Sequence, residues 1–123
     1  MSNHELDGYG FTEMVSAGAR HLSQTARQVD TLNVFPVPDG DTGTNMNLTL
    51  TSGVEEMNRQ NSSHIGRVAN ALSRGLLMGA RGNSGVILSQ LFRGFAKEIQ
   101  DCETISAREF AKALQHGVDT AYR

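Results

Sequence analysis

Residues 33–46 read NVFPVPDGDTGTNM and join two segments whose apolar residues recur at helical spacing. Pro36 and Pro38 fix the backbone φ angle and lack an N–H donor, so the apolar residues beside them predict an extended loop and not a strand. Gly40 and Gly43 permit the tight turns that such a connection needs. The stretch therefore predicts a stiff, turning connection between two helices.

The remainder of the chain is predicted to be helical. Apolar residues recur every three or four positions in five segments, which is the pattern of amphipathic helices. One helix is expected over about residues 11–31, and the apolar stripes of the other four lie within residues 46–57, 65–76, 88–99 and 106–121. Ser106 and Glu109 have the spacing of a capping box for the last helix, and Ser62 or Ser63 would cap the third. Because no stretch alternates apolar and polar residues for long enough to form a strand, we expect an all-α helical bundle.

Length and composition restrict the class of protein. The chain has 123 residues, 38% of them hydrophobic and 20% charged, with a net charge of -2. These values are typical of one folded domain and exclude a disordered chain or a strongly basic nucleic-acid binder. Cys102 is alone, so the chain has no internal disulfide and no cysteine zinc cluster. Since we also find neither a signal peptide nor a run of roughly 18 apolar residues, we expect a cytoplasmic protein without a membrane span.

Two acidic residues in the first loop predict a metal site. Asp39 and Asp41 are separated by one glycine, and a sharp turn there would direct both carboxylates to one centre. Mg²⁺ prefers oxygen ligands such as these carboxylates, and it completes its coordination sphere with water and substrate phosphate. Thr42, Thr44 and Asn45 follow at the start of the second helix, where backbone N–H groups and the helix dipole favour an anion. The same residues also fit an ordinary turn with a threonine N-cap.

A second glycine-rich stretch, residues 79–85, reads GARGNSG and leads into the fourth helix. Its regularly spaced glycines let a ligand approach the backbone, and Ser84 with the following N–H groups would hold a phosphate, with Arg81 adding charge. No Lys-Ser or Lys-Thr pair follows, so this is not a P-loop, and Val86 excludes a nucleophile elbow. The alternative is a simple helix–helix turn, residues 78–84, with Asn83 or Ser84 as the N-cap.

Residues 33–46 and residues 79–90, which read GARGNSGVILSQ, together resemble the nucleotide-binding domain of the dihydroxyacetone-kinase L family. Residues 33–38, NVFPVP, are similar to its bacterial fatty acid kinase branch, at the N-terminal domain of that kinase. The resemblance covers essentially the whole chain and implies an antiparallel all-α barrel of eight helices that holds ATP or ADP with two Mg²⁺ at one end. Because the chain has about five of these helices, we expect residues 1–123 to be a partial domain that lacks the C-terminal helices of the family.

The resemblance also implies roles for residues in both loops. Asp39 and Asp41 match the metal ligands of the family, and Asn33 takes the place of a third upstream ligand at a spacing that differs by one residue. The implied phosphate or metal-shell contacts are Thr42, Thr44, Asn45, Gly82, Asn83, Ser84 and Gly85.

The implied activity is phosphoryl transfer. In the fatty acid kinase branch the acceptor is a fatty acid carboxylate presented by a separate binding protein, and the product is an acyl phosphate. Metal clamping, positioning and charge stabilisation would carry the reaction without a covalent enzyme nucleophile. Two other functions stay open, namely a kinase for dihydroxyacetone or another polyol and a non-catalytic helical interaction module. We also expect little turnover from residues 1–123 alone, and exposed apolar surface that favours homo-oligomers.

Overall fold

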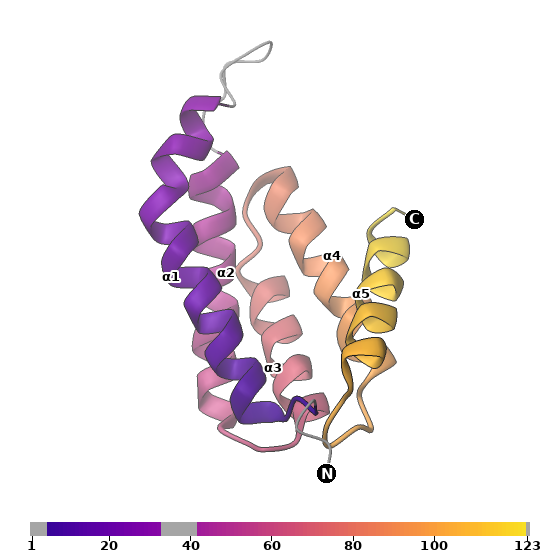
Figure 1. The fold of residues 1–123 in the computed structure, drawn as a ribbon. Helices are drawn as coiled ribbons and strands as arrows, with labels where there is room; N and C mark the ends of the chain where they lie inside the picture. Colours follow the sequence, from indigo (N-terminus) through magenta and orange to yellow (C-terminus); the bar gives the residue numbers. More distant parts are fainter. Residues whose placement is uncertain (1–4, 33–41, 123) are drawn as a thin grey trace.

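A computed structural model describes residues 5–32 and 42–122, and these residues form five helices (Figure 1). The helices are α1 (Gly8–Leu32), α2 (Thr42–Gln60), α3 (Ile65–Met78), α4 (Gly82–Glu98) and α5 (Ala107–Ala121). Successive helices run in opposite directions, so α2 and α4 begin at the same end of the bundle (Figure 1). Within the described ranges, the only β pairing is an isolated antiparallel bridge between Leu6 and Ile105. The prediction of an all-α helical bundle is confirmed.

The starts of α3 and α5 show how local sequence sets helix boundaries. The side chain of Ser106 accepts a hydrogen bond from the Glu109 N–H, and the Glu109 carboxylate accepts one from the Ser106 N–H at 2.7 Å. This is the predicted capping box. The cap expected for α3 is wrong, because neither Ser62 nor Ser63 is the N-cap. His64 takes that position, and its ring nitrogen Nδ1 accepts a backbone N–H of the first turn at 3.2 Å.

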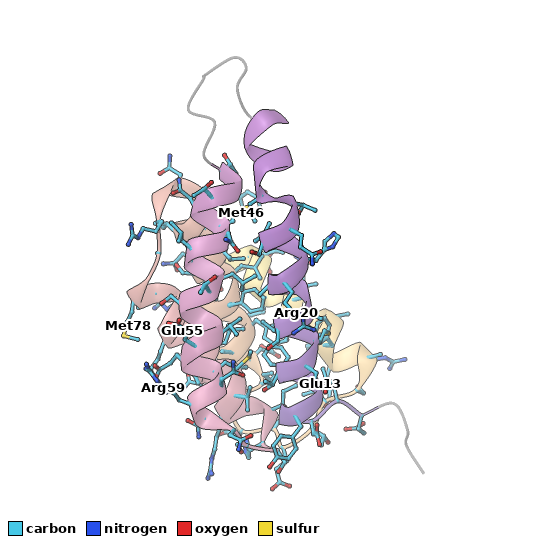
Figure 2. All side chains as sticks on the ribbon, turned by 90° about the vertical axis from the view of Figure 1, so that its left-hand side faces the viewer. Glu13, Arg20, Met46, Glu55, Arg59 and Met78 are labelled. Carbon is cyan, nitrogen blue, oxygen red and sulfur yellow. The ribbon has the colours of Figure 1, made fainter. Side chains whose placement is uncertain are left out.

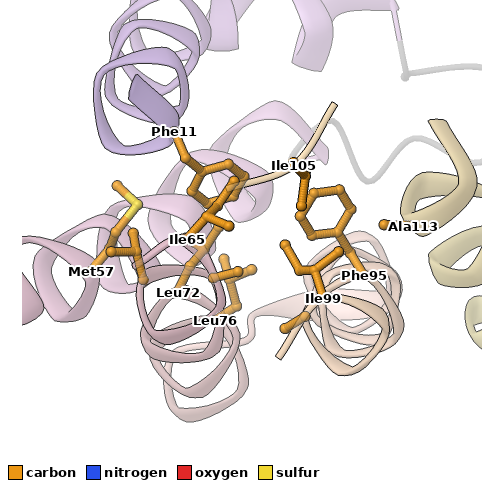
Figure 3. Packing of buried hydrophobic residues seen from close by; sticks show 12 residues of the cluster. Phe11, Met57, Ile65, Leu72, Leu76, Phe95, Ile99, Ile105 and Ala113 are labelled. Carbon is orange, nitrogen blue, oxygen red and sulfur yellow. The ribbon is translucent and has the colours of Figure 1, made fainter. Parts of the chain in front are cut away.

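The core is centred on the ring of Phe95 in α4. Its centroid lies 5.7 Å from that of Phe11 in α1 and 5.3 Å from that of Phe110 in α5. Phe92 adds a fourth ring at 5.8 Å. Figure 3 shows Ile105 in the same cluster as Phe11 and Phe95, and all three side chains are fully buried. Because aromatic side chains bury large apolar areas, this cluster joins the first helix to the last two.

The central helix of the bundle is α3. Its residues Val68, Leu72 and Leu76 have no exposed surface and follow each other at four-residue spacing. A glycine at position 75 allows α2 to approach, because a Cβ there would lie 2.7 Å from the backbone oxygen of Ser52. The close packing of α2 on α3 fixes where the chain leaves α3 and where the glycine-rich stretch begins.

The outer side of α1 and α2 faces the viewer in Figure 2 and carries the exposed charged residues Glu13, Arg20 and Glu55. Arg20 and Glu55 line a hollow of about 350 Å³ between them. Large apolar side chains are also exposed at the end of α3 and the start of α4, where Met78 is 70% exposed and Ile87 54%. No helix among the described residues combines the length and the apolar character that a membrane crossing requires.

Candidate functional site

The glycine-rich stretch that follows α3 lies against the first turns of α2. The backbone N–H of Arg81 donates a hydrogen bond to the hydroxyl of Thr49 at 2.9 Å. A Cβ on Gly82 would lie 2.5 Å from Nδ2 of Asn45. Asn45 and Thr49 are one helical turn apart and therefore share a face of α2. The start of α2 and the start of α4 are thus neighbours in space.

A second hydrogen bond fixes the other end of the same connection. The hydroxyl of Ser52 donates to the carbonyl oxygen of Gly75 at 2.8 Å, and the N–H of Gly79 donates to that oxygen at 3.1 Å. Gly79 faces Ser52 so closely that a Cβ would overlap its hydroxyl. The connection between α3 and α4 therefore runs along the face of α2 that carries Asn45, Thr49 and Ser52.

The start of α4 differs from the predicted loop over residues 78–84. Only residues 79–81 lie between the helices, and Gly82, Asn83, Ser84 and Gly85 form the first turn of α4. Arg81 is the N-cap, so the alternative in which Asn83 or Ser84 caps the helix is wrong. The reason is the backbone of Gly82, whose φ of +67° suits glycine and lets the chain enter the helix early.

The N-terminus of α4 has the features of an anion site. Arg81 makes no side-chain capping hydrogen bond, whereas His64 and Ser106 cap α3 and α5. The first N–H groups of an α-helix have no partner within the helix, and the dipole adds partial positive charge there. Asn83 is exposed and Ser84 half-buried in this turn, so both are within reach of a ligand.

The predicted residues of the first loop are placed only in part. Thr42, Thr44 and Asn45 lie in the first turn of α2, Thr44 exposed and the other two half-buried. Among the predicted metal ligands, the structure describes none, because Asn33, Asp39 and Asp41 lie outside the described residues. Asp41 is bonded to Thr42, so the acidic pair immediately precedes the end of α2 that contacts Gly82.

Within residues 5–32 and 42–122, no three His, Cys, Asp or Glu side chains gather as a metal site. A cavity of about 800 Å³ lies between α4 and α5 and is lined by Arg93, Lys97 and His116, among others. It does not include the first turn of either α2 or α4. The candidate site is therefore defined by the contact between the two helix starts, and not by this cavity.

Thr49 is the part of the site that sequence reasoning did not find. It has no exposed surface, and its hydroxyl both donates to the Asn45 carbonyl at 2.8 Å and accepts from Arg81. The signal in the sequence is weak, because a threonine inside a helix commonly bonds to the carbonyl four residues earlier. Its four-residue spacing from Asn45 places it on the face of the predicted contacts, which is the one available clue.

The chain is similar to several known protein sequences. A family described as DAK2 domain matches residues 36–123. "Protein YloV" of Bacillus subtilis is 65% identical over 123 residues, which are all of this chain and 22% of that protein. Uncharacterized proteins of Staphylococcus saprophyticus and Staphylococcus aureus are 60% and 56% identical over 119 residues, 97% of this chain and 22% of each protein. The chain thus spans 22% of the length of these curated relatives.

Proposed function

This chain belongs to the DAK2 domain family, and we propose that it is the nucleotide-binding part of a kinase that phosphorylates a fatty acid. The phosphoryl donor is ATP with Mg²⁺, the acceptor is a fatty acid carboxylate held by a partner binding protein, and the product is an acyl phosphate. The family match supports a dihydroxyacetone-kinase-like domain. The choice of acceptor depends on the similarity of residues 33–38 to the fatty acid kinase branch.

One observation carries this proposal, namely the contact between the start of α2 and the start of α4. Asn45 lies against Gly82, and Thr49 binds the backbone of Arg81. Two helix N-termini at one end of the bundle direct two sets of N–H groups and two dipole ends to a shared region. A polyphosphate, whose negative charge is spread over several oxygens, is the ligand class that uses such a region best.

In the proposed site each group of residues has a distinct role. The residues that would contact phosphate are Thr42, Thr44, Asn45, Gly82, Asn83, Ser84 and Gly85. Gly82 has no side chain, so the start of α4 can lie directly against Asn45. Asp39 and Asp41, with Asn33, are the proposed ligands of two Mg²⁺ ions, which would offset phosphate charge. Positioning and charge stabilisation carry the transfer, and no residue acts as a covalent nucleophile.

The proposal is tested with the whole protein, ATP labelled at the γ-phosphate and Mg²⁺. Oleate bound to a fatty-acid-binding protein and free dihydroxyacetone serve as alternative acceptors. We expect label in a product that hydroxylamine converts to a hydroxamate, because acyl phosphates react in this way. If the label appears in dihydroxyacetone phosphate instead, the acceptor is dihydroxyacetone and not a fatty acid. If the whole protein forms a stable assembly but binds no nucleotide and transfers no label, the result would support a non-catalytic interaction module.

A further inference from the structure

Thr49 joins the two segments of the site without being predicted to contact the ligand. We propose that Thr49 is a positioning residue. Its hydrogen bond to the Arg81 backbone holds the glycine-rich stretch, residues 79–85, against α2 and thereby sets nucleotide affinity. This inference rests on the proposed function, since it concerns the same nucleotide site. Nucleotide binding would then depend on a buried residue that does not itself contact the nucleotide.

The burial of Thr49 is the first argument. Its side chain has no exposed surface, so water does not compete for its hydroxyl. The hydroxyl donates to the Asn45 carbonyl at 2.8 Å and accepts from the Arg81 N–H at 2.9 Å. Both bonds connect to residues at the two helix starts. A single side chain therefore relates the first turn of α2 to the N-cap of α4.

Packing around the hydroxyl is the second argument. Gly85 faces the Thr49 oxygen so closely that a Cβ would overlap it. Thr49 is consequently in contact with Arg81, the N-cap of α4, and with Gly85, the last residue of its first turn. Removal of the hydroxyl leaves the partly buried Arg81 N–H without its acceptor, and a polar group in that state is unfavourable. The turn is then expected to move so that the N–H reaches water.

The same helix provides a matched control. Thr51 is also a threonine of α2, and its hydroxyl donates to the carbonyl four residues earlier, that of Asn47, at 2.7 Å. It is exposed, and the described structure gives it no bond to the glycine-rich turn. Thr49→Val and Thr51→Val therefore remove the same kind of bond within the helix, and only the first removes the bond to Arg81.

The first measurement needs no nucleotide. Amide hydrogen exchange by NMR reports how well the Arg81 N–H is protected in the free protein. We expect exchange at Arg81 to be at least about tenfold faster in Thr49→Val than in Thr51→Val. Thr49→Ser keeps the hydroxyl and should restore the protection. If Thr49→Val does not fold, as judged by circular dichroism, Thr49→Ala removes the same hydroxyl and takes its place. Unchanged exchange at Arg81 would overturn the proposal.

The second measurement is the dissociation constant of ADP with Mg²⁺ on the same variants. We expect it to rise about tenfold in Thr49→Val, equivalent to about 1.4 kcal/mol, and to stay near the wild-type value in Thr51→Val and Thr49→Ser. Faster exchange with unchanged ADP affinity would overturn the positioning role and leave the proposed function intact. A wild-type protein that binds no ADP would instead contradict the proposed function, and the positioning role with it.

Discussion

Gly82 of α4 lies against the side-chain amide of Asn45 in α2. A Cβ at position 82 would lie 2.5 Å from Nδ2 and 3.1 Å from Cγ of Asn45, and the φ angle of Gly82 is +67°. Both features require glycine, the first for space and the second for backbone conformation. The contact joins residues that lie in two separate stretches of the sequence, 33–46 and 79–85.

Gly82→Ala is expected to destabilise the fold by about 1–3 kcal/mol, because alanine is strained at positive φ and its Cβ displaces Asn45. Urea unfolding measures the loss. Gly18→Ala is the matched control, since Gly18 lies within α1 and no atom lies within 4 Å of its added Cβ. That variant should gain up to about 1 kcal/mol from helix propensity. Changes of the same sign in both variants would contradict the account.

Phe95→Ala is expected to cost about 3–5 kcal/mol, because it removes the ring that contacts Phe11, Phe92 and Phe110 and leaves a cavity. A loss of this size is a large fraction of the stability of a small domain. Thermal unfolding followed by circular dichroism provides the measurement. Tyr122→Ala, at a side chain that is 88% exposed, should change stability by less than about 0.5 kcal/mol.

Ser106→Ala tests the capping box of α5. It removes the acceptor of the Glu109 N–H, and we expect a loss of about 1 kcal/mol in the free energy of unfolding. The chemical denaturation midpoint should shift while the slope of the transition stays constant, because a cap changes stability and not the surface exposed on unfolding. An unchanged midpoint would show that α5 does not depend on this cap.

Cys102 should react slowly with iodoacetamide in the folded protein. Burial, followed by the charges of Glu109, Asp101 and Glu98, raises the pKa of its thiol above that of an ordinary cysteine. The thiolate is the reactive form, so the alkylation rate should reach half its maximum at a higher pH than it does for a free cysteine in a short peptide. Glu109→Gln should lower that midpoint. A midpoint in the native protein at or below that of the peptide cysteine would contradict this environment.

Sequence patterns predicted the number of helices well and their starts less well. The apolar stripes identified all five helices of the described ranges, because each buries one face. The predicted connection over residues 78–84 included the first three residues of α4, which begins at Gly82. Glycine and short polar residues normally indicate a loop, and here they form the first turn of α4 directly after the N-cap Arg81. The backbone of Gly82, with a φ of +67°, permits this start.

The site was predictable as two motifs but not as one arrangement. Residues 39–45 and 82–85 carried recognisable chemistry, and the structure brings Asn45 and Gly82 together. The metal-binding role of Asp39 and Asp41 stays a prediction. Thr49 could not be identified from sequence, because its function depends on an Arg81 backbone group 32 residues away. Such a contact has no local sequence pattern.

We propose that this end of the bundle binds a nucleotide through Mg²⁺ held by Asp39 and Asp41. The decisive experiment is calorimetric titration of ATP into the protein, with and without Mg²⁺, and into the Asp39→Asn/Asp41→Asn double variant. Glu13→Gln/Glu55→Gln, at two exposed acids of α1 and α2, is the charge-matched control.

The account predicts saturable heat that requires Mg²⁺, persists in the control and is lost in the aspartate double variant. Equal ATP affinity in the wild type and the aspartate double variant would contradict it.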